Sequence, residues 1–232
     1  MSIIDQEKEI ETKLIKSTFS TGIDIIGSAI LGPVWSFKNL VGNCYSAAKQ
    51  VSYYDFLYGI YKKVKEEKLK ESDIEKFAKK LEKEKYFNYI SNIIDSMFFS
   101  KCKIARNILG WITMKYLMED VLDYEDLILI NGLKDVFDIE INEFIKYAQI
   151  PDNGPDKQKD LGVVFIREYN NNDRAFIAKF INMGFLGNDL ASNRFGGGNY
   201  PLRYVKTNVT HRLINYVEIF SKEIYDCKRF QE

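Results

Sequence analysis

A single histidine limits the nucleophilic chemistry that this chain could carry out. A Ser–His–Asp or Cys–His site needs an imidazole that takes the proton of the nucleophile, and His211 is the one histidine in the sequence. No nucleophile elbow of the G-x-S-x-G type accompanies it, and it lies in a stretch with helical spacing. We therefore interpret His211 as a helix-surface or core residue.

Metal, phosphate and acid–base chemistry also lack their usual spacings. The sequence contains neither H-E-x-x-H nor C-x-x-C, and its 3 cysteines are far apart, as is typical of reduced thiols in the cytosol. The glycines 196–198 are not followed by the lysine of a phosphate-binding loop, so they predict a hairpin tip. Asp135 and Asp138 suit helix caps better than a general acid and base. We predict no enzyme activity, no metal and no cofactor.

The rest of the chain is organised around an apolar, glycine-rich stretch at residues 17–48. Its only charged side chains are Asp24 and Lys38. Its larger apolar side chains recur at steps of three and four, the spacing of one helix face. Together with Asp24 and Gly32, they are the candidate contacts to a membrane or to other copies of the chain: Phe19, Ile23, Ile26, Ile30, Val34 and Phe37.

Three interpretations of this stretch stay open. A spanning helix needs about 20 mostly apolar residues, which the stretch supplies, but Asp24, the glycines and Pro33 bring the insertion energy of a lone helix close to zero. Insertion becomes favourable in a homo-oligomer, where small residues let helices approach and Asp24 faces the interior of a bundle. The alternatives are an interfacial or re-entrant element and a buried helical pair in a soluble core.

Most of the remaining sequence has helical periodicity up to residue 150. The apolar residues repeat with a helical period in 53–70, 86–99, 101–119 and 139–149, and the charged stretch 3–16 has a narrower apolar face. Further starts are indicated by a capping box at Ser72, by Asp123 for a helix through Leu133, and by Asp138. These patterns predict a multi-helix bundle over residues 1–150.

The pattern changes after a loop rich in proline, glycine and charge at 151–160, which we interpret as a linker. Residues 161–167 and 200–206 read as strands, 171–183 as a helix, and 188–199 as a polar hairpin tip. Thr207 is placed to cap a closing helix. The predicted fold class is mostly α, with the bundle followed by a small α+β, winged-helix-like domain at 161–232.

The layout resembles the abortive-infection alpha family of bacterial phage-defence proteins. The matching features are the N-terminal glycine-rich segment, the helix start FLYGIYKKV at Phe56, the helical middle, and the stretch NMGFLGND…YVKTNVTHRLINYV from Asn182 to Val217. The resemblance implies a role in growth arrest or death of infected cells. It supplies no catalytic residues.

The leading hypothesis is a non-enzymatic phage-defence effector that acts on the inner membrane through oligomerisation of 17–48. Its C-terminal module would sense a trigger, such as a regulatory protein or an oligonucleotide. The charged N-terminus has no cleavable apolar region, which predicts a cytoplasmic protein that can associate with the inner membrane.

Two alternatives stay open. The first is a winged-helix protein that binds DNA or an oligonucleotide through the outward face of 171–183 and the hairpin. Its candidate contacts are Arg174, Lys179, Arg194, Arg203 and Lys206. The basic excess of this region is small, which favours a protein-contact surface over nucleic acid. The second alternative is therefore an interaction or inhibitor subunit for another protein.

Overall fold

The computed structural model describes residues 43–80, 83–153, 162–189 and 201–229. The candidate membrane or oligomer contacts between Phe19 and Phe37 lie outside these residues, as do the helix expected at 3–16, Arg194 and the hairpin tip. Residues 43–48 of the apolar stretch are described, and they form the first turns of a helix. The sequence predicted that this helix begins ten residues later, at residue 53.

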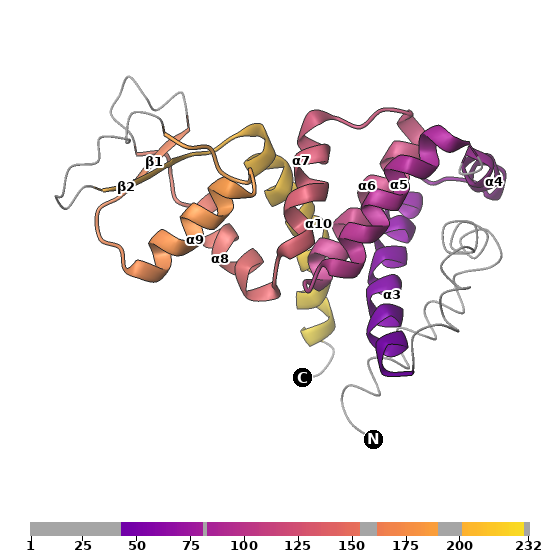
Figure 1. The fold of residues 1–232 in the computed structure, drawn as a ribbon, viewed down its shortest axis with the longest axis horizontal. Helices are drawn as coiled ribbons and strands as arrows, with labels where there is room; N and C mark the ends of the chain where they lie inside the picture. Colours follow the sequence, from indigo (N-terminus) through magenta and orange to yellow (C-terminus); the bar gives the residue numbers. More distant parts are fainter. Residues whose placement is uncertain (1–42, 81–82, 154–161, 190–200, 230–232) are drawn as a thin grey trace.

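The described chain is mostly helical with one small antiparallel sheet, as the sequence predicted at this coarse level (Figure 1). One end of the elongated molecule holds the N-terminal helices, the other holds the sheet with α8 and α9, and α7 and α10 lie between them. The elements are α3 (Asn43–Glu66), α4 (Glu71–Lys80), α5 (Glu84–Phe99), α6 (Lys103–Glu119), α7 (Tyr124–Gly132), the 3₁₀ turn η2 (Leu133–Asp135), α8 (Asp138–Ala148), β1 (Val163–Ile166), α9 (Asn171–Asn182), β2 (Leu202–Val205) and α10 (Asn208–Arg229).

Two glycines let α3 and α6 cross with their backbones in contact. A Cβ atom at Gly59 would lie 1.9 Å from the carbonyl oxygen of Asn107, and one at Gly110 would lie 1.9 Å from that of Phe56. Each glycine therefore faces the backbone of the other helix, and no larger residue fits at either position without moving a helix. This crossing is the centre of the helical end of the molecule.

The apolar periodicity of α5 predicts its buried face correctly. Ile90, Ile93, Ile94 and Met97 were expected to point inward, and all four are buried. The next helix begins two residues later than predicted, with Cys102 as its N-cap. The Cys102 Sγ accepts the N–H of Ala105 at 3.3 Å, and burial raises the pKa of the thiol to about 12. Cys102 thus has a structural role and is far from a reactive thiolate.

The predicted capping box at Ser72 is wrong. The helix begins at Glu71, and the Asp73 carboxylate accepts the backbone N–H of Lys70 at 3.3 Å. The first turn therefore uses the acidic residue one position after Ser72. The observed start differs from the predicted one by a small shift in register, because Ser72 and Asp73 are both good capping residues.

The predicted cap at Asp138 is wrong for a different reason. Phe137 is the N-cap of α8, and its backbone N–H is bound by the Glu140 carboxylate at 3.0 Å. Asp138 instead accepts the N–H of Lys103 at 3.1 Å, at the start of α6. The carboxylate that was expected to begin one helix therefore stabilises the start of another.

The sheet consists of two short antiparallel strands. Val163 pairs with Val205 and Ile166 with Leu202, so both predicted strands are present but shorter than expected. Gly187 exchanges two backbone hydrogen bonds with Val205, of 2.7 and 2.9 Å, on the side of β2 away from β1. The outer edge of β1 is therefore an edge of the sheet.

The helix before the predicted linker packs into the sheet end of the molecule. The Phe144 ring of α8 meets those of Phe180 and Phe185 edge-on at 5.6 and 5.8 Å. The Tyr147 hydroxyl donates to Asp173 at 2.5 Å, and the Tyr204 hydroxyl donates to the carbonyl of Tyr147 at 2.6 Å. The module that follows the helical bundle therefore includes α8, and one continuous buried cluster joins it to α3–α7.

Candidate functional site

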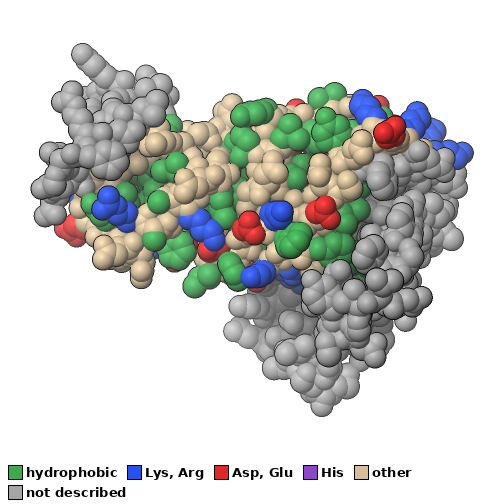
Figure 2. Space-filling model, viewed as in Figure 1, with side chains coloured by type: hydrophobic (Ala, Val, Ile, Leu, Met, Phe, Trp, Pro, Cys, Tyr) green, Lys and Arg blue, Asp and Glu red, His purple; other side chains and the backbone are tan. Residues whose placement is uncertain are grey.

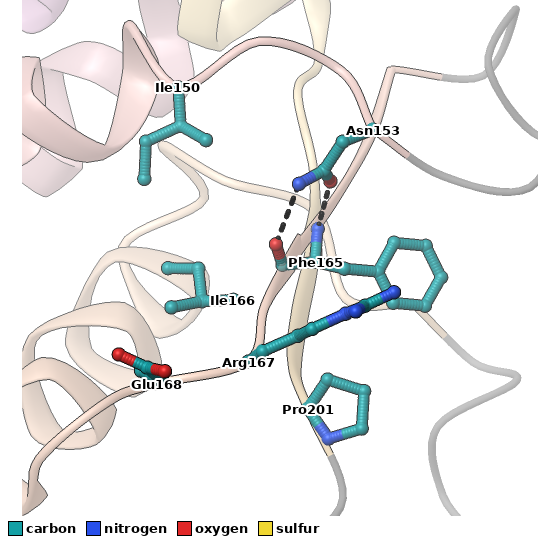
Figure 3. Close-up of a pocket in the computed structure, with 7 residues that line it drawn as sticks. All are labelled: Ile150, Asn153, Phe165, Ile166, Arg167, Glu168 and Pro201. Atoms are coloured by element: carbon teal, nitrogen blue, oxygen red, sulfur yellow. Dashed lines mark hydrogen bonds between the residues drawn. The ribbon is translucent and has the colours of Figure 1, made fainter.

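An open groove of about 780 Å³ runs beside the outer edge of β1 (Figure 3). It begins at the end of α8 and follows the strand to the start of β2. Its floor is mostly apolar and its rim carries one cation and one carboxylate. The lining residues are Ile150, Asn153, Phe165, Ile166, Arg167, Glu168 and Pro201.

Asn153 fixes the wall of this groove by binding the strand edge with its side chain. Its Oδ1 accepts the N–H of Phe165 at 2.6 Å, and its Nδ2 donates to the carbonyl of Phe165 at 2.9 Å (Figure 3). The side-chain amide therefore takes the place of a neighbouring strand at this residue. The loop after α8 is held against β1 by these two bonds, which gives the groove a defined shape.

The rim of the groove suits a ligand that is both apolar and polar, such as a peptide segment. Arg167 and Glu168 are exposed and carry opposite charges. The Arg203 guanidinium lies 4.4 Å from the centroid of the Phe165 ring and is bound by Asp189 at 2.6 Å. The groove therefore lacks the concentrated positive charge with which a polyanion would be recognised.

The structure does not bring the nucleic-acid candidates together as one basic surface. Arg174 lies on the exposed face of α9, while Lys179 is paired with Glu140, Arg203 with Asp189, and Lys206 with Asp152. On the face of the molecule that Figure 2 displays, basic, acidic and hydrophobic side chains are interspersed. Three of the four candidates that the structure describes are thus neutralised by carboxylates nearby, which leaves the DNA-binding alternative without support from geometry.

An ion cluster with one buried carboxylate, Asp126, joins α6, the start of α7 and α10. The Lys115 Nζ lies 2.7 Å from Asp123 Oδ2 and 2.8 Å from Asp126 Oδ2. The Arg212 Nη1 reaches the same carboxylates, at 2.7 Å from Asp123 Oδ2 and 3.2 Å from Asp126 Oδ1. The Tyr216 hydroxyl donates to Asp126 Oδ1 at 3.1 Å, and Asp126 is 0% exposed. The cluster connects three helices at the middle of the molecule.

The cluster also explains why Asp123 does not act as the predicted cap. Asp123 stands at the N-cap position of α7, yet its side chain makes no capping hydrogen bond. Hydrogen bonds from Lys115 and then Arg212 hold the pKa of Asp123 below its usual value. Burial opposes the charge of Lys115, but its hydrogen bonds to Asp123 and Asp126 outweigh that effect and raise its pKa.

The cluster predicts a loss of stability in acid. Because the pKa of Asp123 is lower in the folded than in the unfolded chain, its contribution is present above about pH 4 and is lost as the pH falls through the folded pKa. We expect the urea midpoint to change little between about pH 5 and 7 and to fall below about pH 4. Asp123→Asn should reduce that acid-dependent fall, and an unchanged pH profile in this variant would contradict the assignment.

Beyond the cluster, α10 continues to α3. The Phe220 ring meets the Tyr58 ring at 6.3 Å and the Trp111 ring edge-on at 5.8 Å. The Lys62 Nζ donates to the carbonyl of Ile219 at 3.1 Å. The first turns of α10 therefore contact the sheet end of the molecule, through Thr210 and the carbonyl of Phe185. Its middle contacts α3, the helix that continues from the apolar stretch (Figure 1).

Sequence reasoning missed most of these residues. Asn153 lies in a stretch that reads as a loop, where asparagine is common without any ligand or strand. Asp123 and Asp126 carry a capping signal, and Lys115 reads as one position on a long helix. Lys115 and Arg212 are far apart in the sequence, and only the fold brings both of them to the carboxylates of Asp123 and Asp126.

Together these features define a mostly helical protein with a small sheet-containing module. Over the described ranges, no helix is both long and apolar enough to cross a membrane, and no group of three or more metal-ligating side chains comes together. No family model, curated protein or solved structure matches this chain. The resemblance to the abortive-infection alpha family therefore stays a prediction.

Proposed function

We propose that this chain is a regulated, non-enzymatic effector of the abortive-infection type. The apolar segment 17–48 would act on the inner membrane as an oligomer. The module formed by α8, β1, α9 and β2 would bind a regulatory protein through the groove along β1. Binding there would decide whether 17–48 is restrained or released.

The observation that carries the proposal is the continuous path from the groove module to α3. In its first turns, Thr210 of α10 donates to the carbonyl of Phe185 and Arg212 joins the Lys115–Asp126 cluster, and in its middle Phe220 and Ile219 contact Tyr58 and Lys62 of α3. Since α3 begins at Asn43, inside the apolar stretch, a displacement of α10 would act on the helix that continues from the effector segment. This supports a sensor and an effector that are coupled rather than independent.

The test weakens the contact between α3 and α10 without touching the groove. Lys62→Met keeps the length of the side chain but removes the hydrogen bond to Ile219. If this contact restrains 17–48, losing about 1 kcal/mol should raise the population of the released form about fivefold over the parent chain, and growth and membrane potential should both fall. Lys65→Met, at an exposed position of the same helix, is the matched control.

A deletion variant makes the result specific to the proposed effector. Removing 17–48 from the Lys62→Met chain should abolish the growth defect, because nothing would remain to act on the membrane. A defect that persists after the deletion would refute the proposal, and so would a Lys62→Met chain that is fully harmless although its unfolding curve shows the lost contact.

The nucleic-acid alternative makes an opposite prediction. If the module bound an oligonucleotide, affinity for it should fall steeply with salt, and Arg174→Ala should weaken it. The pairing of Lys179, Arg203 and Lys206 with carboxylates leads us to expect no measurable binding even at low salt.

A further inference from the structure

Exposed apolar side chains and lysines gather where the end of α5 meets the turn before α8. Phe99 is 59% exposed, Phe137 is 43% exposed and Ile139 is 65% exposed, which is unusual for side chains of this size. The Lys134 Nζ lies 4.7 Å from the centroid of the Phe99 ring, and the Lys101 Nζ lies 4.7 Å from that of Phe137. We call these five residues the lysine–aromatic patch.

The backbone holds this patch together. Lys101 and Phe137 form an isolated parallel bridge, in which the N–H of Lys101 donates to the carbonyl of Val136 at 3.3 Å. Phe99 and Lys134 lie just before these residues on the two paired segments. The patch is thus one surface built from two chain segments far apart in the sequence, and none of its residues lines the groove along β1.

We propose that the lysine–aromatic patch docks on the surface of an anionic phospholipid bilayer. Exposed Phe and Ile side chains can enter the boundary of the acyl chains, while lysines beside them reach the phosphates of the headgroups. The inference rests on the proposed membrane function and adds to it the surface that would hold the folded body at the bilayer.

The local charges fit this occupant better than a nucleic acid. Lys101, Lys103 and Lys134 outnumber the nearby Asp135 and Asp138, and Asp138 also accepts the backbone N–H of Lys103. The next pair of charges, Glu140 and Lys179, cancel each other in a salt bridge beside Phe137. An ammonium group lies close to the rings of Phe99 and Phe137, so a nucleobase would have to displace a lysine before it could stack there. A lipid headgroup needs only the lysine charge and leaves these ring contacts in place.

The position of the patch agrees with the path of the chain. In Figure 1 the starts of α6 and α8 lie on the same lower side of the molecule as the first turn of α3. The segment 17–48 leads into α3 at that turn. A bilayer that contacts the patch is therefore on the side of the molecule from which the apolar segment enters the described fold.

The test measures co-flotation of the full chain with phosphatidylcholine vesicles, with and without phosphatidylglycerol. Each lysine near an anionic surface contributes about fivefold in affinity, so Lys101→Ala with Lys134→Ala should lower binding to anionic vesicles about 20- to 30-fold. Binding to neutral vesicles should be unchanged. The anionic increment should also shrink in high salt, because the charges are exposed.

The control is the pair Lys83→Ala and Lys85→Ala. These lysines lie at the opposite end of α5, about 21–24 Å from Phe99 by helix rise, and Lys85 makes a similar contact with the Tyr86 ring. If both double variants lose binding equally, the net charge of the protein alone explains the effect, and the proposal is overturned. Phe99→Ser with Ile139→Ser should weaken binding to anionic vesicles although every lysine remains.

Dye leakage from the same vesicles separates this inference from the proposed function. Leakage that depends on 17–48 but is unaffected by the patch variants would overturn the patch and leave the effector proposal standing. Patch-dependent binding without leakage would support the patch and remove the effector proposal. Binding of a single-stranded oligonucleotide, rather than vesicles, through Lys101 and Lys134 would assign the patch to nucleic acid and overturn the lipid assignment.

Discussion

Gly59→Ala is expected to destabilise the chain by about 3 kcal/mol, although alanine is the better helix former by about 1 kcal/mol. The new Cβ would lie 1.9 Å from the carbonyl oxygen of Asn107, so α3 and α6 must move apart along their whole contact. For a chain of this size, such a loss lowers the melting temperature by about 6–12 °C. Thermal unfolding followed by circular dichroism measures it.

Gly110→Ala should have a similar effect, since its Cβ meets the carbonyl of Phe56 at the same crossing. The two substitutions should not be additive, because the first already separates the helices that the second would push apart. Ala175→Leu, which adds bulk at an exposed position of α9, should leave the melting temperature nearly unchanged. A Gly59→Ala chain that is as stable as the parent would show that the two helices do not cross here.

Asp126→Ala is expected to cost about 3 kcal/mol in the free energy of unfolding. The substitution leaves Lys115 and Arg212 partly buried with only Asp123 as a close shared partner, and it removes the acceptor of the Tyr216 hydroxyl. Uncompensated charge, rather than lost packing, causes most of this cost. Urea unfolding measures it, with the slope of the transition as a check on two-state behaviour.

Two comparisons identify the origin of that effect. Glu125→Ala removes a carboxylate that approaches Arg212 only at 3.8 Å, and it should cost less than about 1 kcal/mol. Adding Lys115→Met to Asp126→Ala should recover part of the stability, because the variant then buries one unpaired charge fewer. If the double variant is less stable than Asp126→Ala alone, the charge explanation fails.

Helical periodicity predicts much of this fold because the buried face of an amphipathic helix is a local pattern. Ile90, Ile93 and Met97 are apolar at helical spacing, so α5 could be predicted together with its inward face. The strands β1 and β2 could be found from their apolar, β-branched composition, although each is shorter than expected. Such features depend on residues that are close in sequence.

Features that depend on distant residues could not be predicted in the same way. Asp123 has the sequence pattern of a helix cap, but Lys115 and Arg212 compete for its carboxylate, and Arg212 is on a helix that begins much later. Gly59 and Gly110 each interrupt an apolar face without indicating that the two residues meet. The groove escaped prediction because Asn153 reaches β1 from a loop, and loops carry no periodic signal.

The side-chain amide of Asn153 has a consequence for solubility. The strand VVFI is apolar, and an unprotected strand edge of this kind is a template on which further chains can add by backbone pairing. By binding both polar groups of Phe165, Asn153 prevents a second strand from starting there. Self-association of this protein through the sheet therefore requires the loop after α8 to lift first, so that one amide protects the chain from cross-β aggregation.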